Sequence, residues 1–261
     1  MNFRDRVVVV TGGLSGIGRA IAEAFSEREA NVVVFDHRDR SRDDEVEGEE
    51  FAARLGTGGR FVRGDVRSEA DIASLFDFVQ QGWQRCDVVV NSAGVNVFRD
   101  FSELTVSDFD LVMEVNVKGT FLVCRRALKL MMSAATDGAS IVNIASNFAF
   151  VGDRGTSIYS ASKGAVVSLT RALAVEYGGS GIRINALCPG ATSTEFNRSF
   201  RENNPAVVDR WRAKTPLRMR GRDSFLASSR DIAGAALFLS SDAAAYMTGS
   251  SVVIDGGWNA E

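Results

Sequence analysis

The sequence predicts an α/β protein built on one doubly wound parallel sheet of about seven strands flanked by helices. Short runs rich in β-branched residues alternate with longer segments of helical periodicity, and a glycine-rich turn follows the first run. Most runs are continuously apolar, as expected for strands buried on both faces of a parallel sheet. The expected strands are Val7–Val10, Val32–Phe35, Arg60–Arg63, Asp87–Val90, Ser140–Ile144, Arg183–Leu187 and Ser251–Ile254.

Helical segments fill the intervals between these strands. One buried helix face is indicated by Ile17, Ala20, Ile21, Ala24 and Phe25, which follow the i, i+3, i+4 spacing. Further helices are expected at 68–85, 105–134, 156–178 and 230–240. Two stretches lack this rhythm. One is the charged connection 36–50, and the other is 191–229, which is expected to form a substrate-covering excursion.

Length and composition limit the classes of function. With 261 residues and no internal linker, residues 1–261 are expected to form a single domain. A net charge of −3 gives no electrostatic basis for binding nucleic acid. No run of 18 apolar residues is present, so no membrane association is expected, and the N-terminus lacks an apolar signal region. Three widely spaced cysteines in apolar surroundings suit a reducing compartment, and a cytoplasmic location is expected.

The single histidine, His37, argues against two kinds of site. It lies in a charged turn far from any candidate nucleophile, which disfavours a Ser-His-Asp triad. An HExxH zinc site needs two histidines and is impossible, and no metal site is predicted. Proton chemistry must therefore use another side chain.

A glycine-rich turn, Thr11–Gly18 with the letters TGGLSGIG, joins the first strand to the first helix. Such a turn lets the backbone approach a pyrophosphate, and the helix N-terminus offers free N–H groups, as in Rossmann-type sheets. Taken alone, a glycine-rich turn can also be an ordinary connection between a strand and a helix. The residues expected to bind a dinucleotide here are Gly12, Ser15, Gly16, Ile17 and Gly18.

Asp36 ends the second strand, where a carboxylate can accept hydrogen bonds from both hydroxyls of an adenosine ribose. The same charge repels a 2′-phosphate, so NAD is favoured over NADP. His37 and Arg38 follow, and a cation there can pair with a phosphate instead. A turn aspartate that caps the next segment is a further alternative.

More candidates follow the third and fourth strands. Ligands of open α/β sheets bind beyond the carboxyl ends of the strands, where these residues are expected. They fit an adenine pocket, although small residues in such positions can equally form tight turns. The candidates are Asp65, Val66, Asn91, Ala93 and Gly94.

A tyrosine and a lysine follow the fifth strand. That strand ends at Ser146, and Tyr159 and Lys163 come next, four residues apart. Positions i and i+4 share a helix face, so the Tyr159 and Lys163 side chains are expected to be neighbours. Asn116 lies among apolar residues of the preceding helix, where an amide needs a partner. Taken singly, Tyr159 can also be a residue at the edge of the core, Ser146 a turn residue, and Asn116 an amide with a local hydrogen-bond partner.

Together these residues resemble the short-chain dehydrogenase/reductase family in its single-domain branch, and the resemblance covers nearly the whole chain. The joint pattern is far more specific than any one motif. The residues that carry it are Thr11–Gly18, Asp65, Asn91–Gly94, Asn116, Ser146, Tyr159, Lys163, Pro189, Gly190, Thr194 and the closing segment Tyr246–Gly257.

The resemblance implies a role for each catalytic candidate. Tyr159 would be the general acid/base, and Lys163 and a positive nicotinamide ring would favour its phenolate against an ordinary pKa of about 10. Lys163 would also bind the nicotinamide ribose. Ser146 would hold the substrate oxygen, and Asn116 would hold a water that relays the proton.

The loop after the sixth strand would receive the nicotinamide end of the cofactor. By the resemblance, Pro189 and Gly190 would turn the chain beneath the ring. Thr192 would contact the carboxamide, and Thr194 the carboxamide or the pyrophosphate. A plain loop after a strand is the alternative.

The implied function is NAD-dependent hydride transfer between a secondary alcohol, or its ketone, and the nicotinamide. One alternative is an NADPH-dependent 3-oxoacyl-thioester (acyl-carrier-protein) reductase. Another, of a different class, is a nucleotide-sensing protein without turnover. The resemblance also implies a homotetramer or homodimer that pairs through 105–134 and 156–178. The substrate stays open, because a fold does not determine a substrate.

The chain departs from its relatives in three places. Ala145 stands where relatives often have serine, which leaves Ser146 in register but removes a neighbouring hydroxyl. Ser92 stands where relatives commonly have asparagine. Asp223–Ser229 looks like an insertion that contains Phe225 and Leu226, and apolar residues in a polar loop must pack on something. This insertion, together with Glu195–Trp211, is expected to form part of the substrate cover or a subunit contact.

Overall fold

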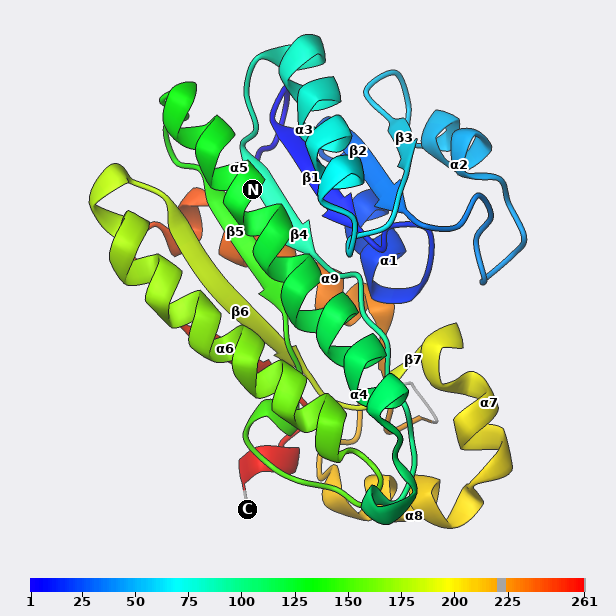
Figure 1. Cartoon of the computed structure of the whole chain (residues 1–261). Coiled ribbons are helices and arrows are strands. Elements are labelled where there is room, and N and C mark those ends of the chain that lie inside the picture. The colour runs from blue at the N-terminus through cyan, green and yellow to red at the C-terminus, as the bar shows by residue number, and fades with distance from the viewer. Residues whose placement is uncertain (220–223, 261) are drawn as a thin grey trace.

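The protein is described from a computed structural model, which places residues 1–219 and 224–260 (Figure 1). Within these residues, seven strands form one sheet in the order β3-β2-β1-β4-β5-β6-β9, and every neighbouring pair is parallel. The predicted doubly wound sheet is therefore confirmed. Its strands are β1 (Val7–Thr11), β2 (Asn31–Asp36), β3 (Arg60–Arg63), β4 (Val88–Asn91), β5 (Ser140–Ile144), β6 (Arg183–Pro189) and β9 (Ser251–Ile254).

Helices cover both faces of the sheet, which explains the continuously apolar strands. On one face α1 (Gly16–Ser26) packs against α9 (Ser229–Ser240), and on the other lie α3 (Glu69–Trp83), α5 (Thr120–Ser133) and α6 (Ser157–Tyr177) (Figure 1). In β1, Val8 and Val10 belong to the first core while Val7 and Val9 belong to the second. Successive side chains of a strand point to opposite faces, so both must be apolar.

The expected helix 105–134 is interrupted in the structure. It consists of α4 (Val106–Met113), a π-helical turn η2 (Glu114–Gly119) and α5. The Thr120 hydroxyl donates to the Asn116 carbonyl at 2.8 Å, and the Asn116 side chain binds the backbone of Val95. Such π turns insert a residue into a helix and are frequent at functional sites. The sequence pattern could not show this break, because it depends on a distant partner.

The excursion 191–229 contains structure that the weak periodicity did not predict. It holds the short parallel pair β7 (Thr192–Ser193) and β8 (Ala227–Ser228), and the helices α7 (Glu195–Asn203) and α8 (Pro205–Lys214). Both helices lie beyond one end of the sheet (Figure 1). Asp223, the first residue of the expected insertion, lies outside the described residues. Phe225 and Leu226 are buried in one cluster with Trp211 and Trp258.

Shorter elements complete the described chain. The helix α2 (Gly48–Arg54) follows the charged connection and packs against β2 and β3. None of the helices in the described part of the chain combines the length and apolar character that a membrane span requires. The 3-10 turns are η1 (Phe101–Glu103), η3 (Asn147–Ala149), η4 (Gly178–Ser180), η5 (Asp242–Ala244) and η6 (Trp258–Ala260).

Candidate active site

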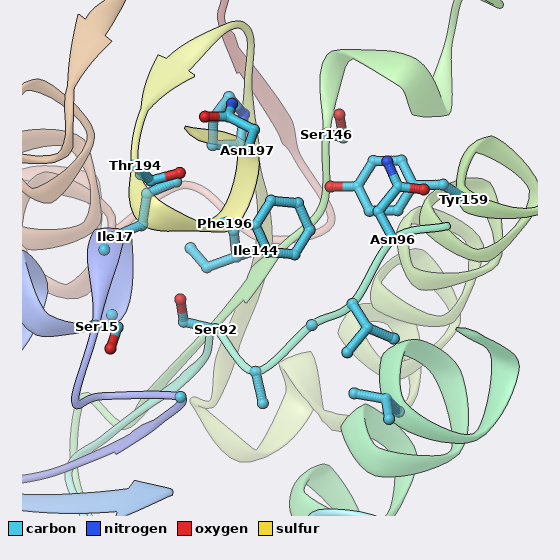
Figure 2. A pocket seen from close by; sticks show the side chains of 18 of the residues that line it. Ser15, Ile17, Ser92, Asn96, Ile144, Ser146, Tyr159, Thr194, Phe196 and Asn197 are labelled. Carbon is cyan, nitrogen blue, oxygen red and sulfur yellow. The ribbon is translucent and has the colours of Figure 1, made fainter. Parts of the chain in front are cut away.

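A pocket lies beyond the carboxyl ends of the strands and brings most of the predicted site residues together (Figure 2). Its volume of about 320 Å³ falls within the range of small-molecule sites. Of the candidates, only Asn91 and Asn116 do not line it. Those that do are Gly12, Ser15, Gly16, Ile17, Gly18, Asp36, Asp65, Val66, Ala93, Gly94, Ser146, Tyr159, Lys163, Pro189, Gly190, Thr192 and Thr194.

Close backbone approach dictates glycine in the turn after β1. Gly12 has φ +63°, and a Cβ there would lie 2.8 Å from the Cα of Ala93. A Cβ at Gly18 would lie 2.2 Å from the Gly12 carbonyl oxygen. The Thr11 hydroxyl oxygen accepts the N–H groups of Ser92 and Ala93, each at 3.2 Å. The turns after β1 and β4 therefore meet at the point where the strand order reverses, which is where such sheets bind nucleotides.

The N-terminus of α1 is in contact with the loop after β2. Ser15 occupies the N-cap position without capping the helix, and its Oγ accepts the Arg42 N–H at 2.8 Å. The Asp43 carboxylate accepts the Gly16 N–H at 2.9 Å. The positive end of the helix dipole attracts anions to the α1 N-terminus. In this structure a carboxylate already accepts one of the free N–H groups there.

Asp36 lines the pocket from the end of β2 and is 8% exposed. Its Oδ2 accepts the Leu14 N–H at 3.3 Å and its Oδ1 accepts the Arg38 N–H at 3.2 Å. Each carboxylate oxygen keeps acceptor capacity for a ribose hydroxyl. Arg38 and Arg42 line the same part of the pocket, so cations stand beside the acid.

The side chains of Asp65 and Asn91 are both engaged by other protein groups. Asp65 lines the pocket, but its carboxylate binds the Arg67 guanidinium at 2.6 Å, which holds the pKa of Asp65 below its ordinary value. Asn91, expected to contact the cofactor, does not line the pocket. Its side chain is buried within the sheet and donates to the Asn143 Oδ1 at 2.8 Å and to the Cys124 sulfur at 3.3 Å.

Ser146, Tyr159 and Lys163 line the same end of the pocket. Figure 2 shows the Ser146 and Tyr159 side chains on the wall opposite Ser15 and Ile17. The Ser146 Oγ accepts the Phe148 N–H at 3.2 Å as the cap of η3. The Lys163 Nζ donates to the Ile144 carbonyl at 2.8 Å and lies 5.6 Å from the centre of the Tyr159 ring. The expected neighbourhood of the Tyr159 and Lys163 side chains is present.

Burial dominates the electrostatics of this group. It raises the pKa of Tyr159 to about 12, although the hydrogen bond with Ser146 lowers it in part. Burial also lowers the pKa of Lys163 to about 8, against a raising influence of Cys188. Without a ligand, burial therefore raises the pKa of Tyr159 more than the neighbouring protein groups lower it, and the neutral phenol is favoured. An efficient base at neutral pH therefore needs an additional positive charge next to Tyr159.

Asn116 lies behind the pocket rather than on it. It is fully buried, and its Oδ1 accepts the Val95 N–H at 2.8 Å. Its Nδ2 donates to the Val95 carbonyl at 2.9 Å and to the Ser162 hydroxyl at 3.0 Å. A Cβ placed on Gly94 would be 3.4 Å from the Asn116 Oδ1 and 3.6 Å from the Lys163 Nζ. The side chain of Asn116 thus secures the loop beside Lys163.

Sequence reasoning missed most of the pocket beyond Tyr159. This part is lined by aromatic and amide side chains from separate loops. Several aromatics stand within a few residues of a recognised motif, which is the one signal that could have indicated them. The residues missed are Asn96, Phe98, Asn147, Phe148 and Trp258, whereas Phe196 and Asn197 lie in the stretch Glu195–Trp211 that was expected to cover the substrate.

The glycine turn, the sheet order and the Ser, Tyr and Lys side chains occur together in this pocket. A family profile described as enoyl-(acyl carrier protein) reductase matches residues 12–259. The chain belongs to the short-chain dehydrogenase/reductase family. It is accordingly an oxidoreductase, and the fold of this family binds a nicotinamide cofactor.

Other members of the short-chain dehydrogenase/reductase family match the chain over nearly its full length. A 2-(S)-hydroxypropyl-CoM dehydrogenase from Xanthobacter autotrophicus is 37% identical over 99% of this chain and 98% of its own. D-threitol dehydrogenase from Mycolicibacterium smegmatis is 38% identical, over 97% and 92% respectively. A solved structure from Beutenbergia cavernae, described as a provisionally assigned NAD(P)-dependent gluconate 5-dehydrogenase with NADP bound at low occupancy, is 33% identical. It covers 100% of this chain and 99% of its own, with a TM-score of 0.87.

Proposed function

We propose that the protein transfers a hydride between a secondary alcohol, or its ketone, and a nicotinamide dinucleotide, with Tyr159 as general acid/base. One observation carries this proposal: Ser146, Tyr159 and Lys163 line the same pocket as the glycine turn that begins α1. In this proposal residues 1–261 act as one dinucleotide-binding and catalytic domain, and 191–229 cover the substrate.

The residues of the turn fit a dinucleotide. Glycine at positions 12 and 18 permits a close backbone approach, and the side chain of Ser15 leaves the α1 N-terminus uncapped. These features suit a pyrophosphate. Pro189, Gly190, Thr192 and Thr194 would then flank the nicotinamide end. The cofactor, when bound, supplies the hydride acceptor and, in its oxidised form, a positive charge near Tyr159.

In alcohol oxidation Ser146 would hold the substrate oxygen and Tyr159 would remove its proton. The C–H bond of the carbinol carbon breaks with its electron pair, the C=O bond forms, and the hydroxyl proton passes to the Tyr159 oxygen. Lys163 would support the phenolate while it keeps its own proton. Asn116 would hold the Val95 backbone in place through its side chain. It would also hold a water through which the proton leaves.

NAD is the proposed cofactor because the Asp36 carboxylate faces the part of the pocket where the adenosine ribose would bind. The Asp43 carboxylate adds a second negative charge at the Gly16 N–H. Arg38 and Arg42 favour the alternative, since both line the pocket and a guanidinium pairs with a phosphate. A relative with bound NADP keeps that alternative open.

A homotetramer or homodimer is proposed for the assembly. Apolar side chains on α4, α5 and α6 are exposed to an unusual degree, and such patches mark contacts. Val106 is 77% exposed, Phe121 44% and Val175 86%. Light scattering coupled to gel filtration tests this directly. A monomeric mass at micromolar protein would contradict it, whereas a Phe121→Asp variant that lowers the mass supports it.

The deciding experiment for the function is a panel of secondary alcohols and their ketones, assayed with NAD(H) and NADP(H) by the absorbance of the reduced cofactor. The proposal expects turnover and a higher kcat/KM with NAD⁺. Asp36→Ala should shift the preference toward NADP⁺. Turnover confined to 3-oxoacyl thioesters with NADPH would favour the acyl-thioester reductase. Cofactor binding without turnover of any substrate would favour a nucleotide-sensing protein.

A further inference from the structure

The substrate part of the pocket points to a substrate class. We propose that the protein acts on an uncharged secondary alcohol or ketone whose carbon body is a ring, rather than on a polyol, a hydroxy acid or an acyl thioester. This inference rests on the proposed hydride transfer at Tyr159. It concerns the aromatic wall, which we define as Phe98, Phe148, Phe196, Trp211 and Trp258, all lining the pocket.

The aromatic wall begins at the catalytic tyrosine. The ring centres of Tyr159 and Phe148 are 6.5 Å apart in an edge-to-face arrangement, and those of Tyr159 and Phe196 are also 6.5 Å apart. Phe148 meets Trp258 at 5.8 Å, edge to face. Figure 2 shows the Phe196 side chain between the Ser15 side of the pocket and the Tyr159 side. A substrate held at Tyr159 therefore has aromatic rings as its nearest large neighbours.

The wall continues away from Tyr159 as a series of ring contacts. Trp258 lies 6.4 Å from Trp211, and Trp211 lies 6.0 Å from Phe200. Phe200 stacks on Phe98 at 3.8 Å between ring centres. The two distances that involve Trp211 fall in the range favoured by aromatic pairs, whereas Phe98 and Phe200 lie closer, with nearly parallel rings. The wall is thus a packed surface assembled from several separate segments and is suited to the flat face of a ring.

Polar contacts hold the central tryptophan in place. The Trp211 Nε1 donates to the Asp153 Oδ2 at 3.0 Å, and Arg210 pairs with the Asp153 Oδ1 at 3.3 Å. Phe225 and Leu226 from the insertion pack in the same cluster as Trp211. An indole with its N–H satisfied presents only apolar surface to a ligand. The insertion therefore supports the wall from behind, which gives its two apolar residues a function.

Charge is distributed unevenly around the pocket. Among the described lining residues, the charged side chains other than Lys163 belong to the nucleotide part, after β2 and β3. They are Asp36, Arg38, Arg42, Asp65 and Arg67, together with the titratable His37. The part beyond Tyr159 offers only amides as polar partners. Of these, Asn197 is occupied, since its Nδ2 donates to the Thr192 carbonyl and its Oδ1 accepts from Arg201.

This distribution discriminates between substrate classes. Lys214, Arg201 and Arg210 lie next to this part of the pocket, but none of them is among the residues that line it. A carboxylate, a sulfonate or the phosphate of an acyl thioester would therefore lose its hydration without gaining a cationic partner among the described lining residues beyond Tyr159. A polyol would leave most of its hydroxyls facing aromatic carbon, which is equally unfavourable. A ring gains apolar contact instead. The unpartnered buried amide atoms, Asn96 Oδ1 and Asn147 Nδ2, allow a single polar substituent near the reacting carbon.

Four alcohols with NAD⁺ and NADP⁺ test the inference. The probes are 1-phenylethanol, mandelate, 2-butanol and D-threitol. Mandelate keeps the ring and adds a carboxylate, while 2-butanol removes the ring. We expect kcat/KM for 1-phenylethanol to exceed that for each of the others by about 10- to 100-fold. Preference for 2-butanol or D-threitol would overturn the ring inference, and preference for mandelate would overturn the inference that the substrate is uncharged. Each of these results would leave the proposed hydride transfer intact.

Binding to the Trp211→Leu variant gives a second readout that does not require turnover. Acetophenone, titrated against the cofactor-loaded protein, should quench its tryptophan fluorescence. Trp211→Leu should weaken acetophenone binding and raise the KM for 1-phenylethanol about tenfold, with cofactor affinity unchanged. Trp83→Leu, at the end of α3 and outside the pocket, is the matched control and should change neither.

The outcomes of the two readouts separate the proposals. Acetophenone binding without turnover of any alcohol would support the aromatic site and contradict the hydride transfer. Equal acetophenone affinity in Trp211→Leu and the unaltered protein would overturn the ring inference. Asp153→Asn, which keeps an acceptor for the Trp211 N–H, should preserve acetophenone affinity, whereas Asp153→Leu should reduce it.

Discussion

The Lys163 Nζ lies 5.6 Å from the centre of the Tyr159 ring, one helical turn along α6, yet its hydrogen bond goes to the Ile144 carbonyl. The lysine is thus held in place by β5 rather than by the tyrosine. Both side chains are buried, which raises the pKa of Tyr159 and lowers that of Lys163. In the proposed mechanism, the pair therefore becomes an effective base only when a further positive charge lies next to Tyr159.

Tyr159→Phe should abolish turnover and leave cofactor binding intact. Loss of a general acid/base typically costs about 10²- to 10⁴-fold in kcat. Steady-state rates and a cofactor titration measure the two effects separately. Tyr246→Phe is the control, because Tyr246 is fully exposed and should tolerate the change. A Tyr159→Phe variant with full activity would defeat the proposed mechanism.

The two directions of the reaction should depend differently on pH. Oxidation needs ionised Tyr159, and burial raises its pKa toward about 12, so kcat/KM for the alcohol should rise with pH from 7. The rise should flatten above about pH 8, because burial lowers the pKa of Lys163 to about 8 and its supporting charge is then lost. Reduction needs the protonated phenol, which predominates from about pH 7 to about pH 10, so its kcat/KM should stay nearly level. Initial rates at saturating cofactor in both directions provide the measurement. Parallel profiles would contradict the assignment of Tyr159.

Asp43→Asn should strengthen cofactor binding. The Asp43 carboxylate accepts the Gly16 N–H at the end of α1, and it must leave if a phosphate is to use that group. Removing the charge should lower the Kd for both NAD⁺ and NADP⁺ by about three- to tenfold, since an exposed charged hydrogen bond is worth little. Isothermal titration calorimetry measures both constants. Asp39→Asn, on the same loop with a 70% exposed side chain, should change neither. Weaker binding in Asp43→Asn would reverse the interpretation of the contact.

Asn116→Ala should destabilise the fold. The substitution leaves the Val95 N–H and carbonyl without the two partners that Asn116 provides. Unsatisfied buried backbone groups should lower the free energy of unfolding by roughly 2–5 kcal/mol. Urea denaturation measures this loss. Asn203→Ala is the control, because the Asn203 side chain binds Ser199 on an exposed helix and should cost less than about 0.5 kcal/mol. Equal midpoints for both variants would show that Asn116 does not secure the loop.

The sequence by itself determined the features that neighbouring residues encode. Apolar runs such as β1 predict strands buried on both faces, because side chains alternate along a strand. The four-residue spacing of Tyr159 and Lys163 predicts a shared face of α6, because it matches one helical turn. Glycine at positions 12 and 18 predicts a close backbone approach. None of these inferences needs knowledge of a distant partner.

Only the tertiary structure decided where long-range partners meet. Asn91 turned out to bind Asn143 on the neighbouring strand, and Asn116 to lie in a π-helical turn and bind Val95. The aromatic wall joins rings from segments as far apart as Phe98 and Trp258. Such contacts depend on how the strands are ordered and how the loops beyond them converge, and no local spacing in the sequence records that. The proposed catalytic tyrosine could thus be selected from the sequence, whereas the aromatic wall beside it could not.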